Sequence, residues 1–198
     1  MRTGVLGGTF DPVHVGHLIL AEEARRMLAL ERVIFVPAGD PWRKRDRSVS
    51  PATHRVRMVE LAIEGNEAFE VSLVEVDHSG PSYTAETLET LVQRNGALWF
   101  VMGVDALIDL PNWKDPQRII AAARLAVATR PGWERVNVAD LERQIPGLVG
   151  RLQPVDMPMI QVSSSDLRQR IATGQSIRYF VPAAVEAYIR REELYGER

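Results

Sequence analysis

Short, continuous apolar runs alternate along the chain with longer stretches in which apolar residues recur every three or four positions. A continuous apolar run is typical of a parallel strand that is buried on both faces. On this basis we predict strands at residues 4–6, 32–37, 98–103 and 125–129. Two weaker signals, one partly alternating and one short, predict further strands at residues 69–77 and 160–162.

The stretches with helical period predict helices between these strands. They lie at about residues 16–28, 51–63, 116–123, 140–145, 168–172 and 182–191, and another helix begins near Tyr83 or Thr84. Strands that alternate with helices indicate an α/β fold, and 198 residues suit one such domain. We therefore expect a single Rossmann-like, doubly wound parallel sheet in one domain, residues 1–198, with a small helical part at about 163–198.

The apolar positions of three helices predict the side that faces the core. These positions are Leu20, Ala24, Met27 and Leu28 in the first helix, Val56, Val59, Ala62 and Ile63 in the second, and Val185, Tyr188 and Ile189 in the last, with residues 179–182 packing the turn before it.

Composition narrows the classes of function. The formal net charge is -2, so no basic field points to nucleic acid as a partner. Cysteine is absent, which excludes disulfides and thiolate metal sites. We find no signal peptide and no apolar run of membrane-spanning length, so we expect a cytoplasmic protein with no membrane partner.

The segment between the first strand and the first helix carries the most informative polar pattern. It reads Gly-Gly-Thr-Phe-Asp-Pro-Val-His-Val-Gly-His over residues 7–17. We expect Gly7 and Gly8 to take positive φ and to let a ligand approach the backbone. The helix N-terminus beyond them would present free N–H groups to a phosphate. Either His14 or His17 alone is more typical of a core residue or a helix cap, but the pair on one helix face indicates donors to a polyphosphate.

This segment resembles the H-x-G-H signature of the nucleotidylyltransferase superfamily in its bacterial adenylyltransferase form, with every fixed position present. It is neither the G-x-G-x-x-G of dehydrogenases nor a Walker A loop. The resemblance implies that the segment holds the phosphates of a nucleoside triphosphate during attack on the α-phosphorus. It assigns ATP binding to Gly7, Gly8, Thr9 and Phe10, and catalytic contacts to His14 and His17.

A second polar cluster, Ser163, Ser164, Ser165 and Arg168, stands at the start of a later helix. Serines in this position commonly act only as helix caps. The cluster also resembles the second signature of the superfamily, [IV]-S-S-[ST]-x-[IL]-R. The resemblance implies that the three serines bind ATP and that Arg168, whose fork suits a phosphate, contributes to catalysis.

Three further matches are to the nicotinate-nucleotide adenylyltransferase branch of this superfamily. Residues 41–44 align with its P-P-H-K and keep only Pro41 and Lys44, which implies a phosphate contact for Lys44 in what otherwise reads as a solvated loop. A matching S-Y-T segment implies that Tyr83 and Thr84, at a helix N-terminus that favours anions, bind the pyridine carboxylate. An ordinary capped helix would give the same pattern.

The third match is G-x-D-x-L followed by a tryptophan, here Gly103, Asp105 and Trp113. The resemblance implies that Gly103 and Asp105 bind the ATP nucleotide and that Trp113 stacks on the pyridinium ring of nicotinate mononucleotide. Packing against the next helix is the alternative for Trp113.

The sequence shows no covalent nucleophile and no protein metal cage. We therefore expect direct in-line attack by a phosphate on ATP, with Mg²⁺ arriving with the ATP, and nicotinate mononucleotide as the acceptor. Phosphopantetheine adenylyltransferase, whose first motif is very similar, and a non-catalytic nucleotide-binding module are the alternatives. The sequence leaves open whether the chain forms a homo-oligomer.

Overall fold

The computed structural model describes residues 2–39, 49–78, 80–129, 133 and 136–196. The strands are β1 (Thr3–Gly8), β2 (Arg32–Pro37), β3 (Phe69–Val71), β4 (Leu98–Gly103), β5 (Ala123–Thr129) and β6 (Leu152–Asp156). The helices are α1 (Val15–Met27), α2 (Ala52–Ile63), α3 (Thr84–Asn95), α4 (Val104–Asp109), α5 (Pro116–Ala122), α6 (Val138–Gln144), α7 (Ser164–Ala172) and α8 (Ala183–Arg191).

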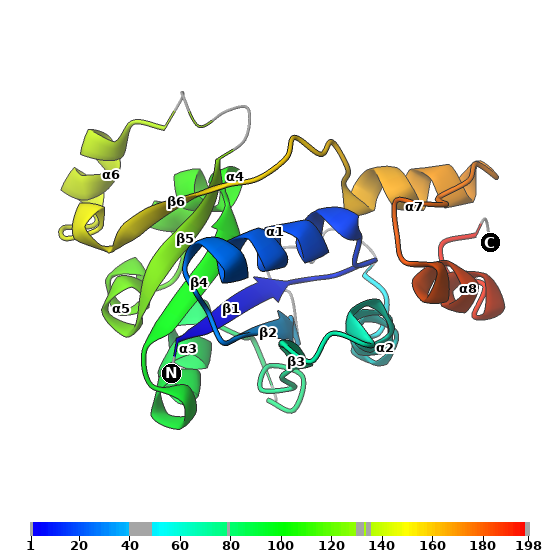
Figure 1. The fold of residues 1–198 in the computed structure, drawn as a ribbon, viewed down its shortest axis with the longest axis horizontal. Helices are drawn as coiled ribbons and strands as arrows, with labels where there is room; N and C mark the ends of the chain where they lie inside the picture. Colours follow the sequence, from blue (N-terminus) through cyan, green and yellow to red (C-terminus); the bar gives the residue numbers. More distant parts are fainter. Residues whose placement is uncertain (1, 40–48, 79, 130–132, 134–135, 197–198) are drawn as a thin grey trace.

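Within the described residues, the strands form one six-stranded parallel sheet in the order β3-β2-β1-β4-β5-β6 (Figure 1). The strand order runs outward in both directions from β1 and β4, so the sheet is doubly wound, as predicted. In such sheets, ligands bind beyond the carboxyl ends of the strands at which the order reverses. Here that place lies at the ends of β1 and β4.

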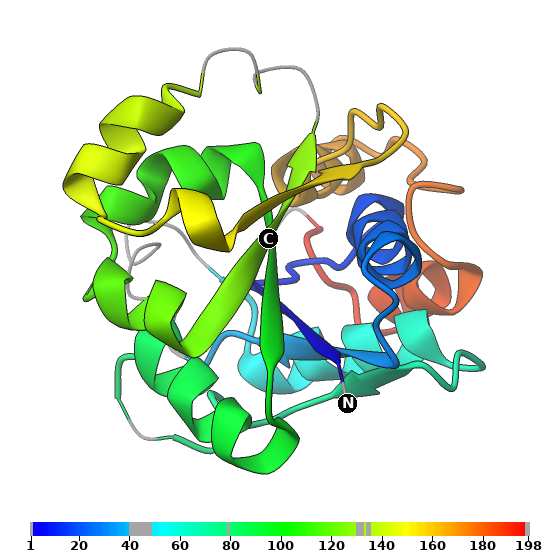
Figure 2. The ribbon, with the colours of Figure 1, turned by 60° about the vertical axis from the view of Figure 1, so that its left-hand side comes forward.

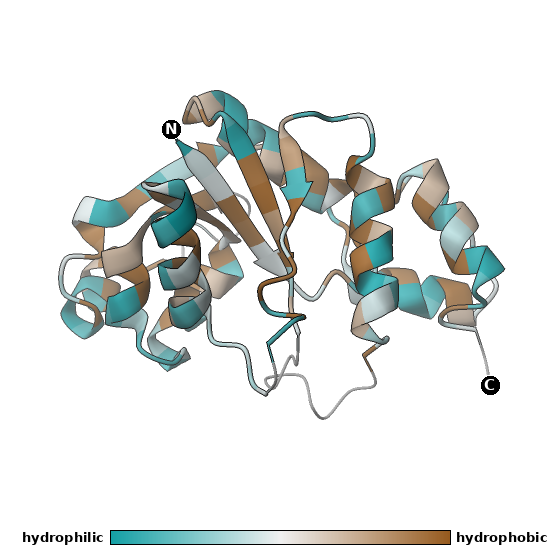
Figure 3. Ribbon diagram, turned by 90° about the horizontal axis from the view of Figure 1, so that it is seen from below, coloured by the Kyte–Doolittle hydropathy of each residue, from teal (hydrophilic) through white to brown (hydrophobic). Residues whose placement is uncertain are grey.

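Helices cover both faces of the sheet (Figures 1 and 2), and the strand residues alternate between two hydrophobic cores. Leu6 and Phe35 face the core that contains residues of α1, α2 and α8. Val5 and Ile34, their neighbours in the sequence, face the core that contains residues of α3, α4 and α5. Figure 3 shows the hydrophobic residues gathered along the central strands. Burial on both faces explains why β2 and β4 read as continuous apolar runs.

The C-terminal helices α7 and α8 lie beside the carboxyl end of β1 (Figure 1). The predicted apolar face of α8, Val185, Tyr188 and Ile189, is buried in the same core as α1. The hydroxyl of Tyr188 lies 2.8 Å from Nδ1 of His54 on α2. The turn before α8 is packed by residues other than Tyr179, which is 86% exposed, against expectation.

The strand predictions differ from the structure in three places. The strand expected at 69–77 ends at Val71, and residues 160–162 form no strand. The last strand is β6, which the sequence pattern did not predict. Because β6 is an edge strand, contains Pro154 and buries only Val155, it carries neither a continuous nor an alternating apolar signal.

Two predicted core positions differ. Met27 is 39% exposed because α1 ends there, and the buried Leu28 and Leu30 fill the space beyond it. On α2 the inward position predicted for Val56 is taken by the residue before it, the fully buried Arg55.

Candidate active site

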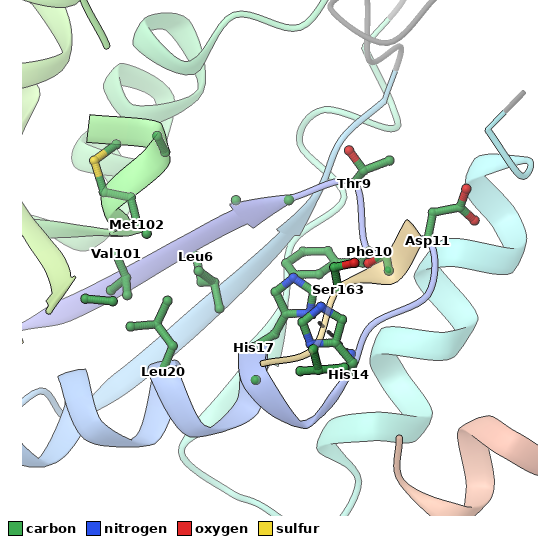
Figure 4. Close-up of a pocket in the computed structure, with 18 of the residues that line it drawn as sticks. Leu6, Thr9, Phe10, Asp11, His14, His17, Leu20, Val101, Met102 and Ser163 are labelled. Carbon is green, nitrogen blue, oxygen red and sulfur yellow. Dashed lines mark hydrogen bonds between the residues drawn. The ribbon is translucent and has the colours of Figure 1, made fainter. Parts of the chain in front are cut away.

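A pocket of about 430 Å³ lies at the carboxyl ends of β1 and β4, where the strand order reverses (Figure 4). It brings together residues that are far apart in the sequence. Of the residues predicted from the sequence, its walls contain Gly7, Gly8, Thr9, Phe10, His14, His17, Gly103, Trp113, Ser163, Ser164, Ser165 and Arg168.

The two histidines share the first turn of α1. His14 is the N-cap residue and His17 is the third helical residue, and their rings stack with centroids 3.7 Å apart. The backbone N–H of His14 donates to Nδ1 of His17 at 3.2 Å. A neutral ring that accepts at Nδ1 carries its proton on Nε2. His17 can therefore donate a hydrogen bond into the pocket through Nε2.

Gly16, between the histidines, has little room to spare. A Cβ at this position would lie 3.1 Å from both the His14 ring and the Val162 side chain. The His14 ring and the segment before α7 therefore pack directly over the backbone of α1 at Gly16.

The glycines at the end of β1 act differently from the prediction. Neither Gly7 nor Gly8 has a positive φ; the residue that does is Phe10, with φ 51°. The Phe10 ring is 2% exposed and meets His17 edge-on, with centroids 5.0 Å apart. A Cβ on Gly8 would lie 2.9 Å from the Phe10 ring. Gly8 is therefore needed for the close approach of a side chain of the protein, and the expected approach of a ligand stays a prediction.

The N-terminus of α1 is partly closed by the protein itself. The N–H of Val15 donates to the carbonyl of Phe180 at 2.9 Å, and the N–H of His17 donates to the carbonyl of His14 at 3.0 Å. The expectation that this turn presents free N–H groups is therefore wrong at these two positions. The turn before α8 supplies one of the two acceptors.

The serines before α7 make internal contacts. Ser163 is the N-cap of α7, and its hydroxyl accepts from the N–H of Asp166 at 3.1 Å. The hydroxyl of Ser164 donates to the carbonyl of Pro12 at 2.8 Å. Capping, the alternative raised from the sequence, is therefore confirmed for Ser163, and Ser164 joins α7 to the segment before α1.

Arg168 makes a second link between the same two segments. Its Nη1 donates to the carbonyl of Asp11 at 2.7 Å, and its Nη2 donates to the hydroxyl of Ser165 at 3.3 Å. Because the backbone of one motif holds the guanidinium of the other, the two motifs form one site.

The opposite end of the pocket lies at β4. Gly103 is the N-cap of α4 and lines the pocket. Trp113 also lines it, with its Nε1 donating to Asp109 at 3.0 Å and its ring meeting that of Phe100 edge-on. Trp113 thus packs inside the protein and also faces the pocket. Asp105 is exposed and lies outside the pocket walls, so its proposed contact stays a prediction.

Tyr83 and Thr84 lie outside the walls of this pocket. Tyr83 is the N-cap of α3 and Thr84 is its first residue. The ammonium of Lys114, which follows Trp113 in the sequence, lies 3.8 Å from the centre of the Tyr83 ring. Lys44 lies outside the described residues.

Sequence reasoning missed the buried Arg55 on α2. Its guanidinium is 1% exposed and donates to three backbone carbonyls, those of Thr9, Gly39 and Ser50, at 2.9 to 3.1 Å. Burial lowers the pKa of Arg55, and the charge of Asp11 opposes this shift. A charged residue at an inward helical position was the available signal.

Sequence reasoning also missed the partners of Asp11, which is 3% exposed. The hydroxyl of Tyr195 donates to its Oδ1 at 2.6 Å, and the N–H of Ser50 donates to its Oδ2 at 3.2 Å. Burial, together with the charge of Asp11, raises the pKa of Tyr195 far above its usual range. Tyr195 therefore stays protonated as a donor.

Glu75 joins the end of β2 to α3. Its Oε1 accepts from the hydroxyl of Thr87 at 2.8 Å, and the carboxyl also accepts from the N–H of Gly39. A Cβ on Gly39 would overlap the backbone carbonyl of Glu75, so the two segments touch directly. Burial raises the pKa of Glu75, although both hydrogen bonds and the charge of Arg55 oppose the shift.

One wall of the pocket is apolar. It comes from α1, the end of β5 and the segment before α7, and consists of Leu20, Ala128, Met157, Ile160 and Val162. The sequence pattern did not assign these residues to a site, because apolar side chains are equally typical of a core. Apolar side chains beside a few polar groups are typical of small-molecule sites and suit a nucleobase.

The described residues hold neither a candidate metal cluster nor a candidate membrane-spanning helix. No three His, Cys, Asp or Glu side chains there lie together in a way that could hold a metal ion. None of the described helices is both long enough and apolar enough to cross a membrane.

Comparison with known proteins adds to this geometry. The family model described as cytidylyltransferase-like matches residues 5–170. A protein of Thermomicrobium roseum, named as a probable nicotinate-nucleotide adenylyltransferase, is 47% identical over 98% of this chain and 91% of its own length. A protein of the same name from Dehalococcoides mccartyi is 43% identical over 98% of this chain and 97% of its own length.

The fold is also found among solved structures. The nicotinic acid mononucleotide adenylyltransferase of Plasmodium falciparum, complexed with NaAD, superposes with a TM-score of 0.79. The alignment covers 98% of this chain and 97% of that one at 18% identity. This likeness supports the doubly wound fold.

Proposed function

Because this chain belongs to the nicotinate-nucleotide adenylyltransferase family, we propose that it transfers the adenylyl group of ATP to nicotinate mononucleotide. The products are nicotinate adenine dinucleotide and pyrophosphate, a step towards NAD. The convergence of two sequence motifs on one pocket carries this proposal: Arg168 and Ser164 bind the backbone of Asp11 and Pro12 directly.

The reaction needs little covalent chemistry from the protein. A phosphate oxygen of nicotinate mononucleotide attacks the α-phosphorus of ATP, and the bond from that phosphorus to the bridging oxygen of pyrophosphate breaks. The attacking oxygen is already ionised at neutral pH, so no strong general base is required. Catalysis then consists of positioning the reactants and stabilising the charge that moves onto pyrophosphate.

The polar end of the pocket supplies groups for that task. His17 can donate through Nε2, His14 stacks against it, and the guanidinium of Arg168 carries a fixed positive charge beside the first motif. We propose that these three side chains hold the triphosphate, with backbone groups of residues 7–10 and Ser163–Ser165 around them. Adenine would then rest on the apolar wall formed by Leu20, Met157 and neighbouring residues.

The mononucleotide side is proposed at the β4 end. Trp113 faces the pocket there, and an indole can stack on a positively charged pyridinium ring. The N-terminus of α3, at Tyr83 and Thr84, contacts Lys114, the residue after Trp113, through the Tyr83 ring. A helix N-terminus favours a carboxylate over an uncharged amide, which supports a preference for nicotinate over nicotinamide. Lys44 stays a predicted phosphate contact.

Mg²⁺ is proposed to enter as part of the Mg–ATP substrate. It prefers oxygen ligands and keeps several waters, which agrees with a pocket that offers hydroxyl groups and backbone oxygens. A cytoplasmic location stays a prediction, and whether the chain forms a homo-oligomer stays open.

The test is pyrophosphate release with Mg–ATP and, in parallel, nicotinate mononucleotide, nicotinamide mononucleotide or phosphopantetheine. We expect turnover with the first and much weaker turnover with the second. Equal use of both pyridine nucleotides would keep the reaction but remove the proposed role of the α3 N-terminus. Turnover of phosphopantetheine alone would contradict the proposed substrate, and no turnover with any acceptor would favour a nucleotide-binding module.

A further inference from the structure

Three segments that are distant in the sequence meet at Asp11. The hydroxyl of Tyr195, after α8, donates to its Oδ1, and the N–H of Ser50, before α2, donates to its Oδ2. The guanidinium of Arg168, on α7, donates to its backbone carbonyl. The side chain of Asp11 is buried, so these segments fix its position more firmly than solvent contacts could.

A buried carboxylate needs donors, because losing one leaves a charged acceptor without compensation. At 2.6 Å, the bond from Tyr195 is short, as expected for a hydroxyl donating to a charged oxygen. The same hydroxyl lies 3.9 Å from the sulfur of Met58 on α2, so apolar packing surrounds it. Without the hydroxyl, the electron-rich Oδ1 of Asp11 would turn towards a neighbouring cation.

Two cations interact with the Tyr195–Asp11 pair. The charge of Asp11 acts to raise the pKa of Arg55, and the charge of Arg168 acts to lower the pKa of Tyr195. Arg55 is already committed to three backbone carbonyls. Arg168 lines the pocket, and its guanidinium is bound directly to the backbone carbonyl of Asp11. A shift of Asp11 would therefore displace Arg168, through either the carboxylate or the backbone carbonyl that it binds.

We propose that Tyr195 is a positioning residue of the triphosphate site, acting through Asp11 on the guanidinium of Arg168. This role rests on the function proposed above, in which Arg168 contacts the phosphates of ATP. Tyr195 is not itself one of the residues that line the pocket, but its partner Asp11 is. The segment after α8, to which the sequence analysis assigned no role, thereby becomes part of the arrangement that positions Arg168.

The direct test is Tyr195→Phe, which removes only the hydroxyl. Tyr188→Phe is the matched control. Tyr188 lies in the same C-terminal helical part as Tyr195, but its hydroxyl contacts His54 on α2 instead of Asp11. We expect Tyr195→Phe to lower kcat about fivefold to tenfold, the effect of one lost hydrogen bond, and to leave KM for the mononucleotide within about twofold. Tyr188→Phe should change kcat less than about twofold. Equal kcat values in the two variants would overturn the proposal, whatever their melting temperatures.

A double-mutant cycle with Arg168→Lys tests the route. If Tyr195 acts through Arg168, adding Tyr195→Phe to Arg168→Lys should lower kcat by less than about twofold further. The same fivefold to tenfold loss in both backgrounds would mean that the hydroxyl acts independently of Arg168, and would overturn the proposal.

The affinity for Mg–ATP, measured by calorimetry on the same four proteins, separates this proposal from the function. If the parent protein binds ATP but turns over no acceptor, the proposed function fails, and the cycle is read from the dissociation constants alone. The proposal would still be supported if Tyr195→Phe weakened ATP binding in the parent background but had no effect on ATP binding in the Arg168→Lys background. Unchanged affinity in every variant, with no turnover, would contradict it.

Discussion

The imidazole rings of His14 and His17 lie almost parallel, with their planes inclined by 22° and their centroids 3.7 Å apart. The backbone N–H of His14 holds Nδ1 of His17, so the start of α1 sets the orientation of the second ring. The first turn of α1 thus places both imidazoles in the pocket wall, stacked against each other.

His17→Ala should leave the fold intact and reduce turnover by roughly a hundredfold or more, as losing one key donor does in other enzymes. Steady-state pyrophosphate release measures this, with circular dichroism to verify folding. His54→Ala removes an imidazole that contacts Tyr188 outside the pocket, and it should leave kcat unchanged. Parental turnover in His17→Ala would refute the phosphate contact.

Arg55→Lys should destabilise the protein by about 2–4 kcal/mol, because one ammonium cannot replace a fork that reaches three buried carbonyls. Urea unfolding measures the free energy. Arg57→Lys is the matched control on the same helix, since Arg57 is exposed and pairs with the exposed Glu60, and it should change stability by less than about 0.5 kcal/mol. Equal changes in the unfolding free energy at the two positions would mean that the buried contacts of Arg55 do not stabilise the protein.

Glu75→Gln should make stability less dependent on pH. Burial raises the pKa of Glu75 in the folded protein, so folding favours the protonated carboxyl. Its contribution to the unfolding free energy is full below the ordinary value of 4.5 and is lost as pH rises through the folded pKa. The unfolding free energy, measured between about pH 4 and 8, should therefore fall less steeply with pH for Glu75→Gln than for the parent.

The same substitution at the exposed Glu64 controls for the loss of one negative charge. Parallel pH curves for the parent and Glu75→Gln would contradict the burial argument. A steeper fall for Glu75→Gln than for the parent would mean that folding lowers the pKa of Glu75 instead of raising it.

Trp113→Ala should weaken nicotinate mononucleotide binding about tenfold while changing ATP binding little, because a cation–π contact contributes about 1–2 kcal/mol. Calorimetry with each substrate measures both affinities. Trp113→Phe keeps a ring but loses the bond to Asp109, so it should lie between the parent and Trp113→Ala. Equal losses for the two substrates would instead indicate that Trp113 acts by packing.

Much of the fold was predictable because its signals are local. The runs at 32–37 and 98–103 became β2 and β4 with the predicted bounds, since central parallel strands are apolar on both faces. Edge strands lack that signal, which is why β6 was missed and β3 was drawn too long. The site was predictable in a similar way: each motif is contiguous, and the pocket gathers both.

The supporting contacts were not predictable, because each joins residues that are remote in the sequence. Tyr195 and Asp11 are 184 positions apart, and no local pattern marks such a pair. The free N–H groups expected at α1 failed for the same reason, since the acceptor at Phe180 lies on a turn near the other end of the chain. Only Arg55 left a local trace, as a charge on an apolar helix face.

The link between Arg168 and Asp11 spans 157 positions, and this has a consequence for synthesis on the ribosome. The first motif leaves the exit tunnel early, but the groups that complete it are translated long afterwards. Contacts of such long range also form late in folding, after the cost of closing a large loop. A nascent chain that stalls before α7 would carry most of the sheet and both histidines, yet it would lack the guanidinium that completes the site. Incomplete translation products of this protein should therefore consume no ATP.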